Sequence, residues 1–322
     1  MIAVIGGSGF IGTRLCNLLS NNNIDFKVID IKKSQDYPDK YIYGDVTNLE
    51  SLKTALIDAD KIINLAAEHK DNVHPISLYY QVNVQGAKNV CDAAHMLGIN
   101  HLIFTSSVAV YGFVEKETGE DGEFNPFNDY GKSKLEAEFV YTDWQSKDNS
   151  RTLVVIRPTV VFGEKNRGNV YNLFNQIASG NFLMIGSGEN KKSMAYVENV
   201  SAFISYCTNL EAGQYIYNYV DKPDFTMNQL TSVICSSLGR KPKNIHIPYF
   251  IGLLGGKIFD LGSILTKKEF PVSSIRVKKF CAKTQFKSNS IDALSFKAPT
   301  TLEQGIVNTV QYEFLNKDAQ KY

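Results

Sequence analysis

Three side chains that can move a proton occur within a short stretch of the chain: Ser107, Tyr130 and Lys134. Tyr130 and Lys134 are four residues apart, so they share one face of a predicted helix. Tyr130 is the only one of the 17 tyrosines with a lysine at that spacing. A free tyrosine has a pKa of about 10, so a tyrosine base needs positive charge beside it near neutral pH. Lys134 would supply that charge, and Ser107 would hydrogen-bond the substrate oxygen.

A glycine-rich loop, Gly6-Gly-Ser-Gly9-Phe-Ile-Gly12, connects the first predicted strand to the first predicted helix. Glycines there allow a sharp turn and let backbone N–H groups approach a pyrophosphate at the helix N-terminus. Asp30 ends the second predicted strand, where an acidic residue would bind the adenosine ribose hydroxyls. Its carboxylate would repel a 2′-phosphate, which favours NAD over NADP. Lys32 and Lys33 weaken that preference, and Asp30 could instead only cap a turn.

Short apolar runs alternate with helical patterns through the first half of the chain. This alternation predicts parallel β-α-β units and an α/β fold, a Rossmann-type doubly wound sheet with helices on both faces. The predicted strands are Ile2–Ile5, Phe26–Asp30, Lys61–Ala66, His101–Ser106 and Leu153–Arg157, and the predicted helices are Ile11–Ser20, Leu49–Leu56, Ile76–Leu97 and Tyr130–Lys147.

After Gly163 the alternation gives way to Gly- and Asn-rich connections, which predicts a smaller C-terminal α/β lobe that covers the substrate. Residues 195–219 again show helical and strand-like runs, so we expect the two units to interleave. The predicted division is 1–166 and 196–222 for the NAD-binding domain, and 167–195 and 223–322 for the substrate lobe.

Composition narrows the possible partners and location. The 322 residues carry a formal net charge of +1, which argues against nucleic acid or an anionic membrane as the main partner. Five scattered cysteines without a C-x-x-C pair, and the lack of a secretory signal pattern, predict a reduced cytoplasmic protein. The apolar window Ile245–Leu265 contains charges, a proline and four glycines, so we expect a loop and a buried amphipathic helix there, with membrane-surface attachment as the alternative.

The order and approximate spacing of several motifs resemble the extended short-chain dehydrogenases/reductases, in the branch of NAD-dependent nucleotide-sugar epimerases and dehydratases. The resemblance covers nearly the whole chain and is strong to about Gly163. The motifs are the Gly6/Gly9/Gly12 loop, Gly44-Asp45-Val46, Asn64-Leu-Ala-Ala67, Asn83-Val-Gln-Gly86, Thr105-Ser-Ser107, Tyr130/Lys134 and Arg157-Pro158.

The resemblance implies which residues bind cofactor and substrate. The implied NAD contacts are Gly6, Gly9, Phe10, Ile11, Gly12, Asp30, Asp45, Val46, Leu65, Ala66, Ala67, Asn83, Ser106, Tyr130, Lys134 and Arg157. The implied contacts to a nucleotide-diphosphate sugar are His69, Ser107, Asn169, Leu183, Lys192 and Arg276. Asp45 could instead begin a turn, Asn83 could be a buried helix residue bonded to backbone, and Arg276 could be a solvated surface residue. We expect no metal site, although His69 and His74 flank Asp71.

The two residues after Ser107 argue against two of the reactions found in this branch. The 4,6-dehydratases that the chain resembles have an Asp-Glu pair there, and sugar-acid decarboxylases have a glutamate. Val108 and Ala109 occupy those places and cannot transfer a proton. The resemblance therefore implies a UDP-hexose or UDP-N-acetylhexosamine 4-epimerase that acts through a 4-keto intermediate, or an NAD(P)H-dependent 4-keto reductase, and the sequence leaves both open.

Two further possibilities remain at this point. Tyr196-Val-Glu-Asn-Val200 also occurs in hydroxysteroid-type dehydrogenases, and a non-catalytic NAD-binding scaffold would keep the glycine loop. The resemblance and the two long helical segments, Ile76–Leu97 and Tyr130–Lys147, predict a homodimer. Surface-glycan synthesis is the setting that the family suggests by analogy.

Overall fold

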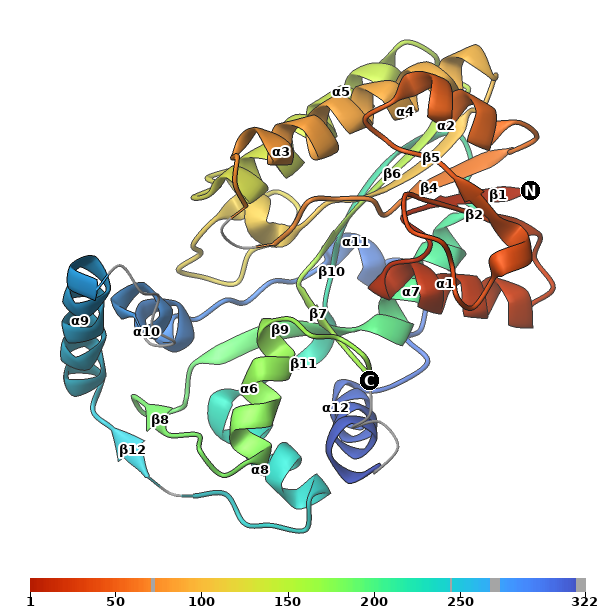
Figure 1. The fold of residues 1–322 in the computed structure, drawn as a ribbon. Coiled ribbons are helices and arrows are strands. Elements are labelled where there is room, and N and C mark those ends of the chain that lie inside the picture. The colour runs from red at the N-terminus through yellow and green to blue at the C-terminus, as the bar shows by residue number, and fades with distance from the viewer. Residues whose placement is uncertain (71–72, 244, 267–272, 317–322) are drawn as a thin grey trace.

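The computed structural model describes residues 1–70, 73–243, 245–266 and 273–316. A seven-stranded parallel sheet forms its largest part, with strand order β10-β6-β5-β4-β1-β2-β3 (Figure 1). The chain reverses its direction of sheet growth between β1 and β4, which is the arrangement of a Rossmann-type fold. The strands are β1 Ile2–Ile5, β2 Phe26–Asp30, β3 Tyr41–Tyr43, β4 Lys61–Asn64, β5 His101–Thr105, β6 Thr152–Pro158 and β10 Gly213–Tyr219.

Helices cover both faces of this sheet, and side chains alternate between two cores because successive residues of a strand point to opposite faces. Ala3 and Ile5 pack into one core, and Ile2 and Val4 pack into the other. On the sheet's first face lie α2 Leu49–Leu56, α4 Gly86–Met96 and α5 Asp129–Ser146; on the second lie α1 Phe10–Asn21 and α7 Val197–Cys207.

Shorter helical elements connect these layers. Before α4 the chain forms α3 and then the π-helical segment η2, so the predicted helix Ile76–Leu97 is three consecutive elements. The connecting elements are α3 Ser77–Tyr79, η1 Pro38–Lys40, η2 Tyr80–Gln85 and η3 Val108–Tyr111.

A second unit is built around a three-stranded sheet of order β11-β9-β7 and a two-stranded pair, β12 with β8. Its strands are β7 Val160–Phe162, β8 Met184–Ile185, β9 Lys191–Tyr196, β11 Asp221–Thr226 and β12 His246–Ile247. Its helices are α6 Asn169–Ala178, α8 Met227–Ser237, α9 Tyr249–Thr266, α10 Ser274–Cys281, α12 Leu302–Val310 and the π-helical η4 Gln311–Leu315. Phe162, Phe174 and Ile306 lie in its core.

The predicted division into two units stays a prediction, and the packing shows which later segments lie on the large sheet. β10 pairs with β6 in the large sheet, as the strand-like run before Tyr219 suggested. However, α11 Asn289–Asp292 lies by β10, and Leu294 and Phe296 pack on the sheet's second core, although the predicted division assigns them to the other lobe. Both β10 and the segment with Leu294 and Phe296 therefore pack on the large sheet, with strands and helices of the second unit between them in the sequence.

The prediction of a buried helix within Ile245–Leu265 is wrong about burial. The helix α9 is present, but Phe250, Leu254, Ile258 and Leu261 are mostly exposed. An apolar composition predicts that a helix is removed from contact with water. It does not predict whether the same chain or a partner covers that helix. No described helix is both long and apolar enough to cross a membrane.

Candidate active site

In the glycine loop between β1 and α1, the backbone passes very close to the backbone of the segment after β4. Gly6 has a φ of +77°, and a Cβ on it would lie 2.8 Å from the Ala66 nitrogen. The Gly9 N–H donates to the Gly6 carbonyl over 3.0 Å, and α1 begins directly after Gly9. Because α1 points its N-terminus at this turn, the loop offers N–H groups and a positive helix end to an anion.

Asp30 stands at the end of β2 and organises the same loop. Its carboxylate accepts the Ser8 N–H over 3.1 Å and the Lys32 N–H over 2.9 Å. The turn-forming role that the sequence left open is therefore present. The carboxylate also stands beside the glycine loop, where the family's acidic residue is expected.

Asp45 likewise forms a turn, because its Oδ1 accepts from the Thr47 N–H over 2.9 Å and from the Thr47 hydroxyl over 2.8 Å. Val46 next to it is buried, and its carbonyl accepts from the Asn89 side chain over 2.8 Å. These contacts fix the segment after β3 at the carboxyl edge of the sheet.

Asn83 ties the loop after β4 to the helix that carries the catalytic candidates. It accepts the Glu68 N–H over 2.9 Å, and its amide donates to the Glu68 carbonyl over 3.1 Å and to the Ser133 hydroxyl over 2.9 Å. At the start of that loop, Asn64 accepts the Ala66 N–H over 3.0 Å. The segment that contains Leu65, Ala66 and Ala67 is thus held between β4 and α5.

Ser107 and Tyr130, two of the predicted catalytic residues, lie next to each other. Ser107 follows β5 and caps η3 by accepting the Ala109 N–H over 3.1 Å, while Asn128 caps α5 by accepting the Gly131 N–H over 2.9 Å. A hydrogen bond joins the Ser107 and Tyr130 side chains. Burial raises the pKa of Tyr130, and this hydrogen bond opposes the rise.

Lys134 is buried one turn after Tyr130 and donates to the Thr105 carbonyl over 2.8 Å. Its burial lowers the pKa to about 7, and the nearby Glu138 carboxylate opposes that shift. The Lys134 ammonium group therefore lies at the carboxyl end of β5, beside Thr105, two residues before Ser107. With a pKa near neutrality, the protonation of Lys134 responds to changes in the charge around it.

Sequence reasoning missed Glu138, which continues the spacing of Tyr130 and Lys134 by another turn. Glu138 is 4% exposed and Arg157 is 1% exposed, and the two form an ion pair with an Nη2–Oε2 distance of 2.6 Å. The Arg157 Nε also donates to Glu138 over 3.0 Å. The available signal was the i, i+4, i+8 series of polar residues on one helix face.

Arg157 and Ser106 have other partners than the cofactor contacts that the resemblance implies. Arg157 also donates to the Tyr111 hydroxyl over 2.6 Å, and that hydroxyl donates to Asn218 over 2.9 Å. The Ser106 hydroxyl donates to Glu138. Both side chains are buried and hydrogen-bonded within the protein, and their implied contacts with the cofactor stay predictions.

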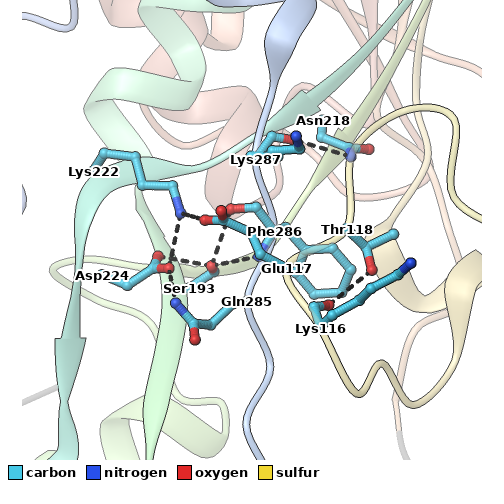
Figure 2. A network of polar contacts seen from close by, with 10 residues as sticks. All are labelled: Lys116, Glu117, Thr118, Ser193, Asn218, Lys222, Asp224, Gln285, Phe286 and Lys287. Atoms are coloured by element: carbon cyan, nitrogen blue, oxygen red, sulfur yellow. Dashed lines mark hydrogen bonds and ion pairs between the residues drawn. The ribbon is translucent and has the colours of Figure 1, made fainter.

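The loop after Ser107 is tied to the second unit by a polar network (Figure 2). Asp224 on β11 accepts from Ser193 on β9 over 2.7 Å, from Gln285 over 2.9 Å and from Lys222 over 2.8 Å. Lys222 also reaches Glu117 in that loop over 2.6 Å. We call these five residues the inter-lobe network.

Four of the predicted substrate residues are exposed and lie on elements that do not carry Ser107, Tyr130 or Lys134. Asn169 is exposed at the start of α6, and Leu183 is exposed just before β8. Arg276 is exposed on α10, and His69 is exposed on the loop after β4. Asp71, beside His69, lies outside the described residues.

Lys192 differs from these exposed residues, because it is partly buried on β9. Its ammonium donates to the Ala282 carbonyl over 2.6 Å, and burial lowers its pKa to about 8. The positive charge is therefore held close to the segment after α10.

A cavity of about 490 Å³ opens in this second unit. It is lined by Ile185, Gly186, Ser187, Asn190, Tyr249, Lys278, Cys281 and Ala282. Its walls come from β8 and its following loop, from the first residue of α9 and from the end of α10. Ala282 accepts from Lys192, so the lysine's partner belongs to the cavity wall. The lining thus includes one cation, three residues with polar side chains other than cysteine, and apolar groups.

Comparison with known proteins shows the family. The model of the NAD dependent epimerase/dehydratase family matches residues 2–218. The chain belongs to this family. It is 50% identical, over 98% of its length and 96% of the relative's, to an N-acetyl-α-D-glucosaminyl-diphospho-ditrans,octacis-undecaprenol 4-epimerase of Escherichia coli O157:H7.

More distant relatives agree with this assignment. The chain is 25% identical to a UDP-glucose 4-epimerase of Vibrio cholerae, over 96% of this chain and 94% of that one. Its fold matches the structure of a UDP-glucose 4-epimerase of Thermus thermophilus in complex with NAD, with a TM-score of 0.73, 19% identity, and coverage of 96% and 97%. The predicted Rossmann-type fold is confirmed.

Proposed function

We propose that this protein is an NAD-dependent 4-epimerase of a hexose derivative that is linked to a carrier through a diphosphate. The observation that carries the proposal is the contact between Ser107 and Tyr130 above a buried Lys134, at the carboxyl end of β5. Ligands of parallel α/β sheets bind at that edge. The identity to the 4-epimerase of Escherichia coli O157:H7 supports the same reaction.

The residues at the sheet edge suit a dinucleotide. A Cβ on Gly6 would collide with Ala66, so backbone approaches backbone at the turn where a pyrophosphate would lie. Asp30 would receive the adenosine ribose, and the segment of Asp45 and Val46 would flank the adenine. Bound NAD⁺ would accept hydride from the sugar and return it.

Tyr130 would take the proton from the sugar 4-hydroxyl and later give it back. Ser107 would hold the same oxygen by a hydrogen bond, and Lys134 would favour the ionised tyrosine by its charge. Glu138 would favour the charged form of that lysine, because its carboxylate opposes part of the effect of burial. Val108 and Ala109 offer no second acid or base, which supports epimerisation over elimination of water.

The second unit would hold the diphosphate and its carrier. Lys192, Asn169 and Arg276 remain the proposed diphosphate contacts, with Leu183 beside the carrier. The relative at 50% identity acts on an undecaprenyl-linked N-acetylglucosamine, which favours a polyprenyl carrier for this chain. A uridine nucleotide is the second candidate, supported by the UDP-glucose 4-epimerase of Vibrio cholerae.

The test is incubation of the purified protein with catalytic NAD⁺ and four substrates: the gluco and galacto forms of N-acetylhexosamine, each linked to undecaprenyl diphosphate or to UDP. Chromatography of the released sugars then reports the product. Interconversion of the gluco and galacto forms without added reductant establishes a 4-epimerase. The preferred carrier is the one whose two sugar forms interconvert at the higher rate. Consumption of NAD(P)H by a 4-keto sugar, without any interconversion, would assign the reductase alternative.

We also propose a cytoplasmic homodimer that acts in polysaccharide synthesis. All five cysteines are free and four of them are buried, which suits a reducing compartment. On α4 and α5, Met96 and Phe139 expose apolar surface that a second copy would cover. A monomeric mass by light scattering would refute the dimer.

A further inference from the structure

The helix α9 exposes a continuous apolar stripe. Phe250, Leu254, Ile258 and Leu261 follow the spacing i, i+4, i+8 and i+11, so they share one helix face. Their exposed fractions are 70%, 60%, 64% and 58%. Soluble proteins seldom leave such a stripe in water unless a partner covers it. Its size and regularity indicate a docking surface.

The opposite face of α9 attaches the helix to the protein. A Cβ on Gly256 would lie 2.8 Å from Ser274, and Asp260 accepts the Ser274 N–H over 3.2 Å. Gly252 approaches Ile185 of β8 in the same way. The helix is therefore fixed through small residues on its inner face, and the large apolar side chains point outward.

We infer that this stripe docks the enzyme on an anionic lipid bilayer, with α9 lying along the surface. Figure 1 shows α9 and α10 side by side at one edge of the molecule, away from the large sheet. Lys257 on α9 and Arg276 and Lys278 on α10 are exposed cations that complement anionic headgroups. The same cations would oppose a close pairing of this edge with a second copy.

The position of α9 links the docking surface to the proposed site. Tyr249, its first residue, lines the 490 Å³ cavity, and so does Lys278. The inference rests on the proposed function in one respect, because a polyprenyl-linked substrate stays in the bilayer. A cavity at the base of a surface-bound helix would meet the diphosphate where it leaves the lipid.

The test is sedimentation of the full chain with vesicles of phosphatidylethanolamine and phosphatidylglycerol, and with vesicles of phosphatidylcholine alone. The double variant Phe250→Gln/Leu254→Gln should bind anionic vesicles more weakly by about tenfold, since it loses two inserted side chains. A matched control, Ile57→Gln/Leu315→Gln, removes two exposed apolar side chains elsewhere and should bind as the parent does. Lys257→Gln should weaken binding to anionic vesicles about fivefold.

Turnover of a short-chain, water-soluble diphosphate sugar checks that the α9 variant is folded, because it should match the parent. Parent-like vesicle binding by that variant would overturn the inference while leaving the proposed epimerase intact. A halved mass of the variant in light scattering without vesicles would also overturn it, since the stripe would then bind a second copy. Vesicle binding by a parent protein that epimerises nothing would support docking and refute the proposed function.

Discussion

The region beneath Ser107, Tyr130 and Lys134 and the region around α9 differ in which side chains they bury. Beneath the catalytic residues, charged side chains are buried and paired, as in Glu138 with Arg157. At the far edge, apolar side chains such as Phe250 are exposed on α9. Under the proposed function, the first arrangement would fix atoms for the reaction, and the second would provide the surface that meets the lipid bilayer. The difference would then separate the chemistry from the recognition of the proposed carrier.

The same contrast appears in how each end is held. Helix α5 is tied to η2, β5 and β6 through Ser133, Lys134 and Glu138. The described part of α9 is fastened mainly to α10, through Gly256 and Asp260. A substitution at the first end should therefore change turnover or stability, and one at the second should change where the enzyme binds.

The largest expected effect is on turnover by Tyr130→Phe. Removal of the hydroxyl leaves no group to exchange the proton of the sugar 4-oxygen, so kcat should fall by about 10² to 10⁴. The measurement is initial rate of epimerisation at saturating substrate. Tyr43→Phe, at an exposed tyrosine of β3, is the matched control and should keep the parent rate. Unchanged turnover in Tyr130→Phe would remove the tyrosine from the mechanism.

Glu138→Gln should cause the largest loss of stability. It leaves the Arg157 guanidinium buried without its counter-charge, which costs about 3–5 kcal/mol. Urea denaturation followed by circular dichroism measures the loss. The control is Glu136→Gln, two residues earlier on the exposed side of α5. A parent-like midpoint for Glu138→Gln would show that the buried pair does not support the site.

Asp224→Asn tests the inter-lobe network. The carboxylate is buried and accepts three hydrogen bonds, so we expect a loss of about 1–3 kcal/mol. Chemical denaturation measures this loss, with the exposed Asp121→Asn as control. If both variants unfold at the same urea concentration, the network does not hold the two units together.

A pH dependence of stability should follow from the lowered pKa of Lys134. Its pKa is about 7 in the folded protein and about 10 in an unfolded chain. Between these values the unfolded chain binds one more proton, so the free energy of unfolding should rise as the pH rises from about 7 to about 10. Lys134→Met should lack this part of the slope, and exposed Lys132→Met should retain it. Equal slopes in all three proteins would contradict the lowered pKa.

The sequence predicted the elements of the N-terminal half best, because each apolar run there fits only a strand or only a helix. Ile2–Ile5 and Leu49–Leu56 have the predicted bounds, because buried strands and short amphipathic helices leave clear patterns. The strand Tyr41–Tyr43 was missed, since it is short and mostly exposed at a sheet edge. The helix α9 was predicted as buried because composition does not distinguish a core from an uncovered surface.

The site was predictable where the spacing along one element defined it. Tyr130 and Lys134 were named from their spacing on one helix, and Ser107 from the chemistry that such a pair needs; their catalytic roles stay predictions. The pair of Glu138 and Arg157 was missed because its partners come from α5 and β6, and only the register of that helix on the strand brings them together. The roles of all these residues remain proposals, and those of the second unit were hardest to predict because they come from several elements that are far apart in the sequence.

The most direct test of the account follows a deuterium atom at C4 of the sugar. The parent protein is given 4-deuterated substrate, catalytic NAD⁺ and no reductant, and the product is analysed by mass spectrometry and NMR. We predict an inverted C4 that keeps its deuterium, because the site removes hydride from that carbon and returns it there. An inverted product that carries protium at C4, or no inversion at all, would contradict the account.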